Sequence, residues 1–362
     1  MKHRLGIFLT CSCLAVGTQA QVPAGYPAGY AETISSANRE GKLIVYSATD
    51  LPAAAPLLKE FRALYPRIEV DYQNMSSVEV YKRFVSESVE GGRSADVLWS
   101  PAMDLQMKLV NDGQAQPYKS PEASKLPAWA VWRNEAFGTT FEPAVFVYNK
   151  RLLAAREVPQ THAALAQLLK DEPRRFMGKV ATYDIEKVGV GFLLATQDSM
   201  TSSGFWDLAQ AMFAAGARLH PTTGAMMERI ASGDSLIGYN LLGSYAIVRA
   251  KTDPSIGYVL PRDYTLVMSR IVFITKRAGS PNAARLWVDF LLSKRGQEII
   301  ANESQLFSLR GDVEGEATAA RLASMLGGSI KPIAVGPGLL TYQDQAKRLE
   351  FMRKWRKAGA AN

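Results

Sequence analysis

The chain has 362 residues, of which 47% are hydrophobic and 21% are charged, which excludes a disordered chain and suffices for more than one buried core. The net charge of +8 falls to +6 without Lys2 and Arg4, and six basic but only two acidic residues stand in the segment 341–362. Since the excess charge gathers at the two ends and not along a groove with interleaved aromatic residues, a nucleic-acid-binding protein is not favoured.

The first twenty residues have the layout of a secretory signal peptide. A basic start and an apolar run over residues 5–16 precede small and polar residues that end at Ala20, which predicts cleavage after that residue. The apolar run is too short to span a bilayer. Both cysteines, Cys11 and Cys13, lie in this segment and follow residues that fit a lipoprotein signal poorly. We therefore expect a periplasmic protein whose mature chain contains no thiol.

Short apolar runs alternate with helical patterns after this leader. Residues 42–46 and 96–99 are apolar with β-branched members, and residues 67–72 alternate between polar and apolar, which predicts three strands. Residues 52–65 and 77–84 lie between these runs and predict helices. The alternation of strands and helices predicts right-handed crossovers and a mainly parallel sheet, whose ligands bind beyond the carboxyl ends of the strands.

Small polar residues follow each of these predicted strands. Because helix N-termini at that edge of a sheet point free N–H groups at a ligand, we expect the polar residues to share one rim and to contact the ligand. For each residue alone, capping of a helix is the competing interpretation. The candidates in this part of the chain are Ser47, Thr49, Asp50, Ser76, Ser77 and Ser100.

Two later stretches resemble the type II periplasmic solute-binding proteins of ABC transporters. Residues 138–150, which end in Tyr-Asn-Lys, resemble the strand that leaves the first lobe of that family and passes the hinge. Residues 271–297, which contain Phe-Leu-Leu-Ser followed by Gly-Gln, resemble the segment that returns to the first lobe, and residues 306–310 resemble the piece after it. The likeness covers roughly residues 38–320. It is closest to the branch that holds ferric-ion, phosphonate and sugar-phosphate receptors.

The resemblance implies an α/β fold of two lobes, each a mixed, mainly parallel sheet flanked by helices. Lobe one would comprise residues 38–140 and 266–320, and lobe two residues 141–265. The ligand would lie in the cleft between them, and the lobes would close by a hinge motion. Residues 321–362 would form a C-terminal extension with a basic amphipathic helix, whose packing on either lobe, on both or against a permease stays open.

The second lobe supplies further candidates at strand ends. Residues 180–183 and 236–240 read as strands, and each leads into a loop and a helix, the first of which is expected to begin near Phe192. Ferric-binding relatives carry a Ser-Gly pair in the first loop, whereas this chain has Val188 and Gly189, so only the backbone match carries over. The remaining candidates are Thr139, Asp184, Lys187, Gly189, Tyr239, Asn240, Ser244, Tyr245 and Asp263.

Three ligand classes stay open. Hydroxyl-rich loops at helix starts, backed by Lys187 and Arg270, favour a small organic anion such as a phosphonate, a sugar phosphate or a carboxylate. Ferric ion is the first alternative, although Ala246 stands where ferric-binding relatives have a second tyrosine; its oxygen donors would be Asp50, Asp184, Tyr239 and Tyr245. A neutral or cationic solute is the second alternative, and its amine partners would be Asp50, Asp184 and Asp263.

The sequence does not favour an enzyme. It contains no zinc-binding His-Glu-x-x-His, no phosphate-binding Gly-Lys-Ser/Thr loop and no Gly-x-Ser-x-Gly elbow. With only His162 and His220 and no cysteine after residue 20, a nucleophile–base pair is poorly supplied. We expect no cofactor, a monomer, and two partners, a small-molecule ligand and an ABC permease in the inner membrane. A ligand-presenting receptor for a sensor kinase would have the same fold and stays open.

Overall fold

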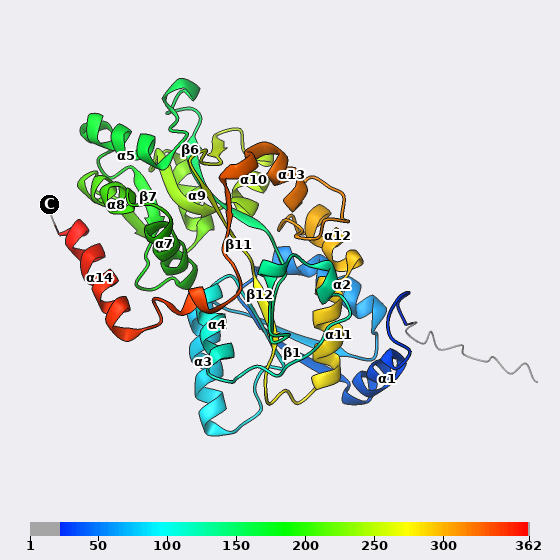
Figure 1. The fold of residues 1–362 in the computed structure, drawn as a ribbon. Coiled ribbons are helices and arrows are strands. Elements are labelled where there is room, and N and C mark those ends of the chain that lie inside the picture. The colour runs from blue at the N-terminus through cyan, green and yellow to red at the C-terminus, as the bar shows by residue number, and fades with distance from the viewer. Residues whose placement is uncertain (1–21, 361–362) are drawn as a thin grey trace, which may run out of the picture.

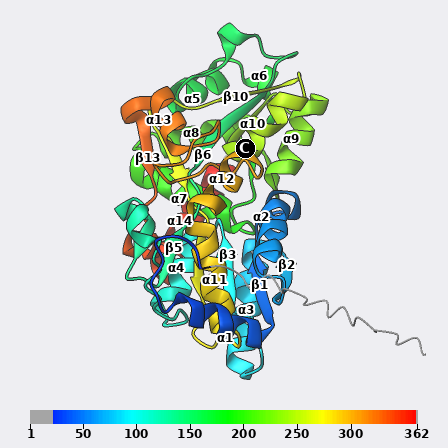
Figure 2. The same cartoon turned by 90° about the vertical axis from the view of Figure 1, so that its right-hand side faces the viewer.

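The computed structural model describes residues 22–360 and shows an α/β protein of two lobes, each built on its own sheet (Figure 1, Figure 2). The expected signal peptide, residues 1–20, lies outside the described residues. Within residues 22–360, none of the helices combines the length and the hydrophobicity that a membrane crossing requires.

The first lobe is built on a six-stranded mixed sheet. Its apolar strands are rich in β-branched and aromatic residues, which suits strands that are covered on both faces. β1 runs parallel to both β2 and β3, and β12 returns antiparallel to β3. The order across the sheet is β2 (Glu69–Asn74), β1 (Lys42–Ser47), β3 (Val97–Ser100), β12 (Ile271–Ile274), β5 (Ala136–Gly138) and β4 (Val131–Trp132).

Helices from both ends of the chain cover this first sheet. Their core is aromatic: Phe61 lies edge-on to Trp287, with ring centroids 5.0 Å apart, and both side chains are fully buried. Ser76 caps α3, the second predicted helix, so this candidate has the helix-capping role that was the alternative to ligand contact. The helices of this lobe are α1 (Tyr30–Glu40), α2 (Leu51–Leu64), α3 (Ser77–Glu90), α4 (Met103–Asn111), α11 (Pro281–Leu292), α12 (Lys294–Asn302) and α13 (Ala319–Leu326).

The second lobe has a seven-stranded mixed sheet. β7 runs parallel to β8 and β9, and the long strand β6 is antiparallel to β9, β10 and β11. The order is β13 (Ile330–Pro332), β11 (Thr265–Met268), β6 (Glu142–Asn149), β9 (Ile237–Leu242), β7 (Val180–Tyr183) and β8 (Arg218–His220), with β10 (Ile256–Val259) also on β6. Its helices are α5 (His162–Asp171), α6 (Pro173–Phe176), α7 (Gly189–Thr201), α8 (Phe205–Ala214), α9 (Thr223–Ser232) and α10 (Gly243–Thr252).

Two helix boundaries differ from the prediction. α3 extends beyond residue 84 to Glu90. α7 begins at Gly189 and not near Phe192. The preceding loop closes on itself, since the N–H groups of Lys187 and Val188 both donate to the carbonyl of Asp184. The helix therefore begins within the Gly-Val-Gly stretch, which the prediction assigned to the loop because glycine disfavours helices.

Two of the crossings of the chain between the two sheets lie side by side. The first links β5 to β6 and the second links β11 to β12. The crossings are bonded to each other, because the Thr139 N–H donates to the Arg270 carbonyl at 3.0 Å. Gln297 of α12 also donates to the Thr139 carbonyl at 2.8 Å. Together these bonds join the two crossings, which we call the hinge crossings, and fix Arg270 at the boundary between the lobes.

The C-terminal part of the chain contacts both lobes. After β13 joins the second sheet, the short helix η5 (Pro337–Leu340) packs on α4 of the first lobe. The basic helix α14 (Gln345–Gly359) then returns to the second lobe and packs on α8. Figure 1 shows this course in orange and red, from β13 past α4 to α14.

Candidate ligand-binding site

Four helices begin at the boundary between the lobes. α2 and α4 follow β1 and β3 of the first lobe, and α7 and α10 follow β7 and β9 of the second. The first turn of α7 faces the start of α4 so closely that a β-carbon at Gly189 would lie 3.1 Å from that of Ala102. No side chain caps any of these four N-termini. The first turn of α4 already contains the buried carboxyl of Asp104, whereas the free N–H groups and positive dipole ends of α2, α7 and α10 favour negative charge at this boundary.

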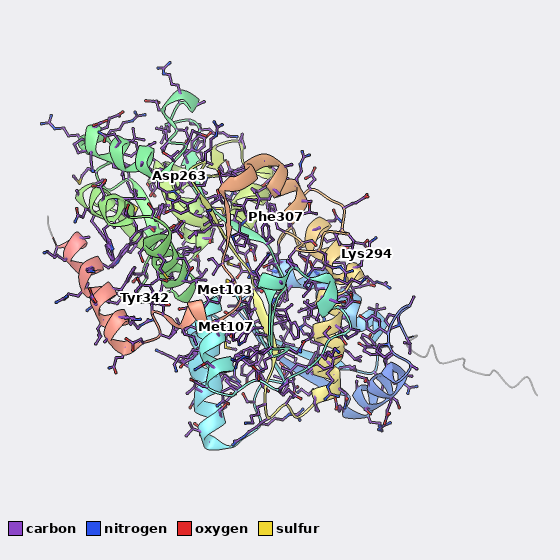
Figure 3. All side chains as sticks on the ribbon, viewed as in Figure 1. Met103, Met107, Asp263, Lys294, Phe307 and Tyr342 are labelled. Atoms are coloured by element: carbon purple, nitrogen blue, oxygen red, sulfur yellow. The ribbon has the colours of Figure 1, made fainter. Side chains whose placement is uncertain are left out.

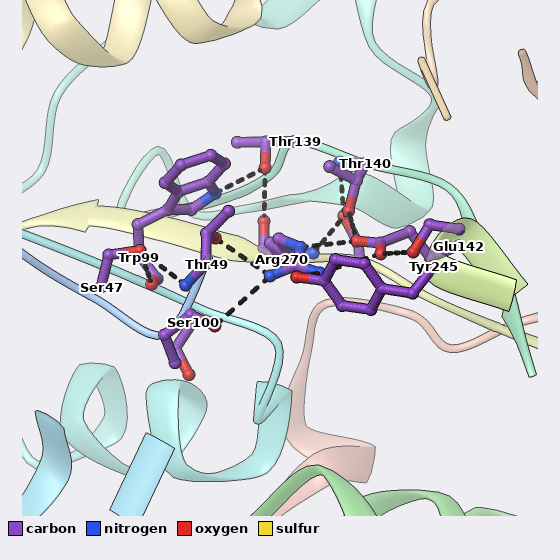
Figure 4. Close-up of polar contacts among 12 residues, drawn as sticks. Ser47, Thr49, Trp99, Ser100, Thr139, Thr140, Glu142, Tyr245 and Arg270 are labelled. Atoms are coloured by element: carbon purple, nitrogen blue, oxygen red, sulfur yellow. Dashed lines mark hydrogen bonds and ion pairs between the residues drawn. The ribbon is translucent and has the colours of Figure 1, made fainter. Parts of the chain in front are cut away.

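Arg270 lies at the centre of the boundary and is fully buried. It pairs with the equally buried Glu142 through two contacts, Nε to Oε1 at 2.7 Å and Nη2 to Oε2 at 3.0 Å. Nη1 donates to the Thr49 hydroxyl at 3.0 Å, and Nη2 donates to the Tyr245 hydroxyl at 3.2 Å (Figure 4). One side chain thus connects the first lobe, both hinge crossings and the second lobe.

The charge of Arg270 is matched inside the protein. Burial disfavours the charged guanidinium, but the Glu142 carboxylate beside it raises the pKa of Arg270 overall. The remaining Nη1 donor is directed at the Ala48 carbonyl at 3.5 Å, so each N–H of the guanidinium points at a protein acceptor. Because it has no spare donor in this arrangement, Arg270 organises the site and does not offer a free cation to a ligand.

Three tyrosines surround Arg270. The Tyr72 hydroxyl donates to the Thr49 carbonyl at 2.6 Å, the Tyr183 hydroxyl is hydrogen-bonded to Thr223, and Tyr245 accepts from Arg270. Burial raises the pKa of each of these phenols. The phenols therefore keep their protons at neutral pH. The Tyr245 hydroxyl accepts from Arg270, so its own proton remains available for donation to an anion.

The predicted residues of the first lobe gather at one rim. Ser47 donates to the Trp99 carbonyl at 2.9 Å and accepts from the Thr49 N–H at 3.0 Å. Ser100 accepts from the Ala102 N–H at 3.3 Å, and the Thr139 hydroxyl accepts from the Trp99 indole at 2.9 Å. These side chains are buried at the ends of β1 and β3 and at the hinge.

The three other first-lobe candidates differ in whether their side chains are already hydrogen-bonded within the protein. Ser76 is committed to a capping box with Glu79. The Ser77 β-carbon lies 3.4 Å from the position that a β-carbon at Gly189 would take, so Ser77 faces the second lobe. Asp50 is exposed, precedes α2 and makes no capping bond.

Four second-lobe candidates also lie at the boundary or at its edge. Ser244 donates to Glu142 Oε2 at 2.5 Å, next to Tyr245. Gly189 opens α7. Asp184 forms an ion pair with Lys187 at 2.9 Å, and the Lys187 side chain is 82% exposed, so its charge faces solvent and Asp184 at the same time.

The structure places three other candidates in the second lobe, with partners other than Arg270: Tyr239 and Asn240 are buried there, and Asp263 lies at its surface. The Tyr239 hydroxyl and the Asn240 amide both donate to the buried carboxylate of Asp198 on α7, each at 2.5 Å. Asp263 contacts His162 Nδ1 at 3.0 Å and lies within the second lobe (Figure 3). These residues point to the face of the sheet that α5 and α7 cover, which a strand pattern alone does not reveal.

The four oxygen donors considered for ferric ion are therefore not brought together. Tyr239 is bound to Asp198 and Asp184 to Lys187, while Asp50 lies at the rim near Tyr245, whose hydroxyl accepts from Arg270. The described part of the chain also contains no group of three or more His, Cys, Asp or Glu side chains that could hold a metal ion.

Sequence reasoning missed several residues of this cluster. Tyr183 is the last residue of β7, so its position at a carboxyl strand end was a usable signal. Glu142 and Thr223 carry no such signal, because their partners Arg270 and Tyr183 lie 128 and 40 residues away in the chain. Tyr72 lies inside β2 and reaches the site only through its long side chain.

Three pockets lie where the lobes meet. One of about 470 Å³ lies between Trp132 of the first lobe, Met200 of α7 and the segment 333–339. A pocket of about 300 Å³ lies between α3, α4, the start of α7 and the C-terminal segment, and it is lined by Asp104, Gly189, Gln343 and Arg348 among others. A pocket of about 250 Å³ lies on α10, beside the loop that follows α12, and it includes Ser244 and Lys251. These volumes lie below or in the lower half of the range of small-molecule sites.

Comparison with known proteins places this architecture among solute receptors. Residues 43–303 match the family model described as bacterial extracellular solute-binding protein. The chain is similar to the crystal structure of the substrate-binding protein of an ABC transporter from Agrobacterium tumefaciens, with 42% identity, a TM-score of 0.84, and coverage of 88% of this chain and 94% of that one. A protein of Haemophilus influenzae is 25% identical over 283 residues, 73% of this chain and 76% of that protein.

More distant structures share the fold alone. The periplasmic binding protein AfuA from Actinobacillus pleuropneumoniae, with fructose-6-phosphate bound, is 18% identical, with a TM-score of 0.72 and coverage of 89% and 99%. The apo ferric ion-binding protein A of Pasteurella haemolytica is 17% identical, with a TM-score of 0.71 and coverage of 89% and 100%.

Proposed function

The chain belongs to the bacterial extracellular solute-binding proteins and is the substrate-binding protein of an ABC transporter; from this premise we propose that its ligand is a small organic anion, such as a phosphonate, a sugar phosphate or a carboxylate. Proteins of this family are not enzymes; they bind small ligands and deliver them to a permease. The proposed ligand would bind between the lobes, next to Arg270, and the lobes would close around it by a hinge motion.

The observation that carries the proposal is the convergence of four uncapped helix N-termini, those of α2, α4, α7 and α10, on one boundary. A phosphate or carboxylate group accepts several N–H bonds at such a place and interacts favourably with the helix dipoles. Protonated phenols of Tyr183 and Tyr245 add hydroxyl donors. The fold that the chain shares with a protein crystallised with fructose-6-phosphate is compatible with this class.

Ferric ion is supported less well. The fold is shared with ferric-binding proteins, but the candidate donors of this chain are engaged with separate partners. A ferric site would require tyrosinate oxygens that converge on one point. The neutral or cationic class rests on Asp50 alone, since Asp184 and Asp263 already have cationic or imidazole partners.

We further propose that residues 1–20 direct secretion and are removed, so that the protein acts in the periplasm as a monomer that delivers its ligand to an ABC permease. A sensor kinase is the competing partner. The neighbouring genes distinguish the two: genes for a permease and an ATPase support import, and a sensor kinase gene supports signalling.

A thermal-shift panel tests the ligand class. Binding to the folded state must raise the melting temperature, by an amount that grows with ligand concentration. We expect a rise with one class among phosphonates, sugar phosphates, and di- and tricarboxylates, and none with neutral sugars. A rise with ferric citrate and a visible tyrosinate–iron absorbance would support iron. A rise only with neutral or cationic solutes would contradict the proposal.

A further inference from the structure

The C-terminal segment crosses the boundary between the lobes twice within a short stretch. It leaves the second sheet after β13, where the Ile333 N–H donates to the Val267 carbonyl at 2.8 Å. It then contacts the first lobe and returns to the second as α14 (Figure 1). We call residues 333–348 the strap.

Three contacts fix the strap to the first lobe. The Val335 N–H donates to the Trp129 carbonyl at 2.8 Å. Leu339 of η5, which packs on α4, is only 4% exposed. Gln343 Nε2 donates to Oδ2 of the buried Asp104 at 2.6 Å. A backbone bond, an apolar contact and a bond to a buried carboxylate together make a specific attachment.

The far end of the strap is held by an aromatic cluster of the second lobe. The Arg348 guanidinium lies 4.0 Å from the centroid of the Phe192 ring. One turn further, Phe351 lies 5.0 Å from Trp206, and Trp355 lies 4.9 Å from Phe213. Since Phe351 and Trp355 are buried, α14 is packed firmly on the second lobe.

The strap has no spare length between these attachments. Gln343 is bound to the first lobe, and Arg348, five residues later, is bound to the second, with α14 beginning at Gln345. A helix rises only about 1.5 Å per residue and does not stretch. Separation of α4 from α7 by more than a few ångströms would therefore break the Gln343–Asp104 bond and pull Leu339 off α4.

The contact between α10 and the loop after α12 also joins the two lobes, but it is more exposed to solvent than the attachment of the strap. There, Lys251 of α10 forms an ion pair with Glu316 of the first lobe at 2.6 Å, and its contact with Gln305 is 3.5 Å long. Both side chains of the pair are largely exposed, at 47% and 83%. An exposed ion pair is screened by solvent and holds two surfaces together only weakly.

We propose that the strap keeps α4 and α7 together, so that the lobes open on the α10 side, where Lys251 and Glu316 separate. The strap thereby sets the direction in which a ligand enters and leaves. The inference concerns the motion of the lobes and does not depend on the chemistry of the ligand. Its strongest support is the difference between a buried, three-point attachment on one side and, on the other, an exposed ion pair beside side chains of α10, such as Ile247, that are only partly buried against the first-lobe core.

Two pairs of spin labels measure the two sides separately by double electron–electron resonance. The labels are placed on cysteines in a chain that carries Cys11→Ser and Cys13→Ser. One pair, Lys82→Cys with Thr201→Cys, spans the strap side. The other pair, Thr252→Cys with Glu314→Cys, spans the α10 side. All four positions are exposed, so labelling leaves the cores intact.

Lys251→Ala is expected to lengthen the distance on the α10 side and to leave the strap-side distance within its wild-type distribution. Lys170→Ala, which removes an ion pair inside the second lobe, is the matched control and is expected to change neither distance. Equal lengthening on both sides in Lys251→Ala, or no lengthening on the α10 side, overturns the proposal.

The double variant Leu339→Ala/Gln343→Ala is expected to broaden the strap-side distance, whereas Leu349→Ala, at a 61% exposed position of α14, is not. If circular dichroism shows that the double variant does not fold, Gln343→Ala alone repeats the test. A folded strap variant with an unchanged strap-side distance overturns the proposal.

Discussion

Arg270 and Glu142 form a fully buried ion pair, in which each charge is compensated by the other. Removal of one partner leaves an uncompensated charge in the interior, which costs about 3–5 kcal/mol. We therefore expect Arg270→Met and Glu142→Gln each to lower the free energy of unfolding by that amount in urea titrations. Replacement of both together should cost less than the sum of the two. A loss below about 1 kcal/mol for Arg270→Met would contradict a matched buried pair.

Tyr245 is the residue through which the second lobe reaches Arg270, and its hydroxyl is a proposed ligand donor. Tyr245→Phe removes one hydrogen bond to a charged group, worth about 1.5–3 kcal/mol, so the affinity for the anion should fall at least about tenfold. Titration calorimetry with the anion found in the thermal panel measures this. Tyr342→Phe, whose hydroxyl lies 3.4 Å from Ser199, is the control and should bind normally. Equal affinity of the two variants for the anion would show that the Tyr245 hydroxyl does not bind the ligand.

Asp104 gives the protein a pH-dependent term in its stability. Burial raises the pKa of this carboxyl from its ordinary value of 3.8 to about 6. Because the folded state then binds the proton more tightly than the unfolded state, the contribution of Asp104 to stability falls as the pH rises from about 4 to about 6. Asp104→Asn should therefore gain in melting temperature relative to wild type between pH 4 and pH 7.

The exposed Asp112, which pairs with Lys108 on the same helix, provides the control. Asp112→Asn removes the same kind of charge from an exposed position at the end of the same helix and so controls for the change of charge alone. A pH-independent difference between Asp104→Asn and wild type would contradict the raised pKa of the Asp104 carboxyl.

At the scale of elements, apolar periodicity and strand-end polarity predicted the first-lobe order of β1, α2, β2, α3 and β3. The start of α7 could not be predicted, because glycine disfavours helices and the reason for it lies in packing. A β-carbon at Gly189 would crowd Ala102 and Leu105, and one at Gly191 would overlap Tyr183. These neighbours are contributed by other elements, so no local pattern encodes them.

Gly243, the first residue of α10, tests this account of close packing. A β-carbon there would lie 2.8 Å from the Pro143 carbonyl and 2.8 Å from a methyl group of Val145 on the hinge strand. Gly243→Ala should therefore destabilise the protein by about 1–3 kcal/mol, although alanine favours helices. Gly224→Ala in the first turn of α9 is the control, since its β-carbon would meet only the Thr222 hydroxyl at 3.8 Å. Equal melting temperatures for the two variants would contradict the packing argument.

At the scale of the whole molecule, the resemblance to type II solute-binding proteins predicted the two-lobed fold and the family, which the 42% identical structure confirms. The site could be predicted only in part. Strand ends indicated Ser47, Thr49 and Tyr245, but neither the direction of the Tyr239 side chain nor the pairing of Arg270 with Glu142 follows from local pattern. Such features depend on how distant segments face each other after folding.

The central claim is that the protein holds a small organic anion at the uncapped helix N-termini beside Arg270. A crystal structure with the anion that most raises the melting temperature tests it most directly. We expect the charged group of the ligand within about 3 Å of backbone N–H groups at the start of α4 or α7 and of the Tyr245 hydroxyl. A ligand bound elsewhere, or one whose charged group touches none of these N–H groups, would contradict the account.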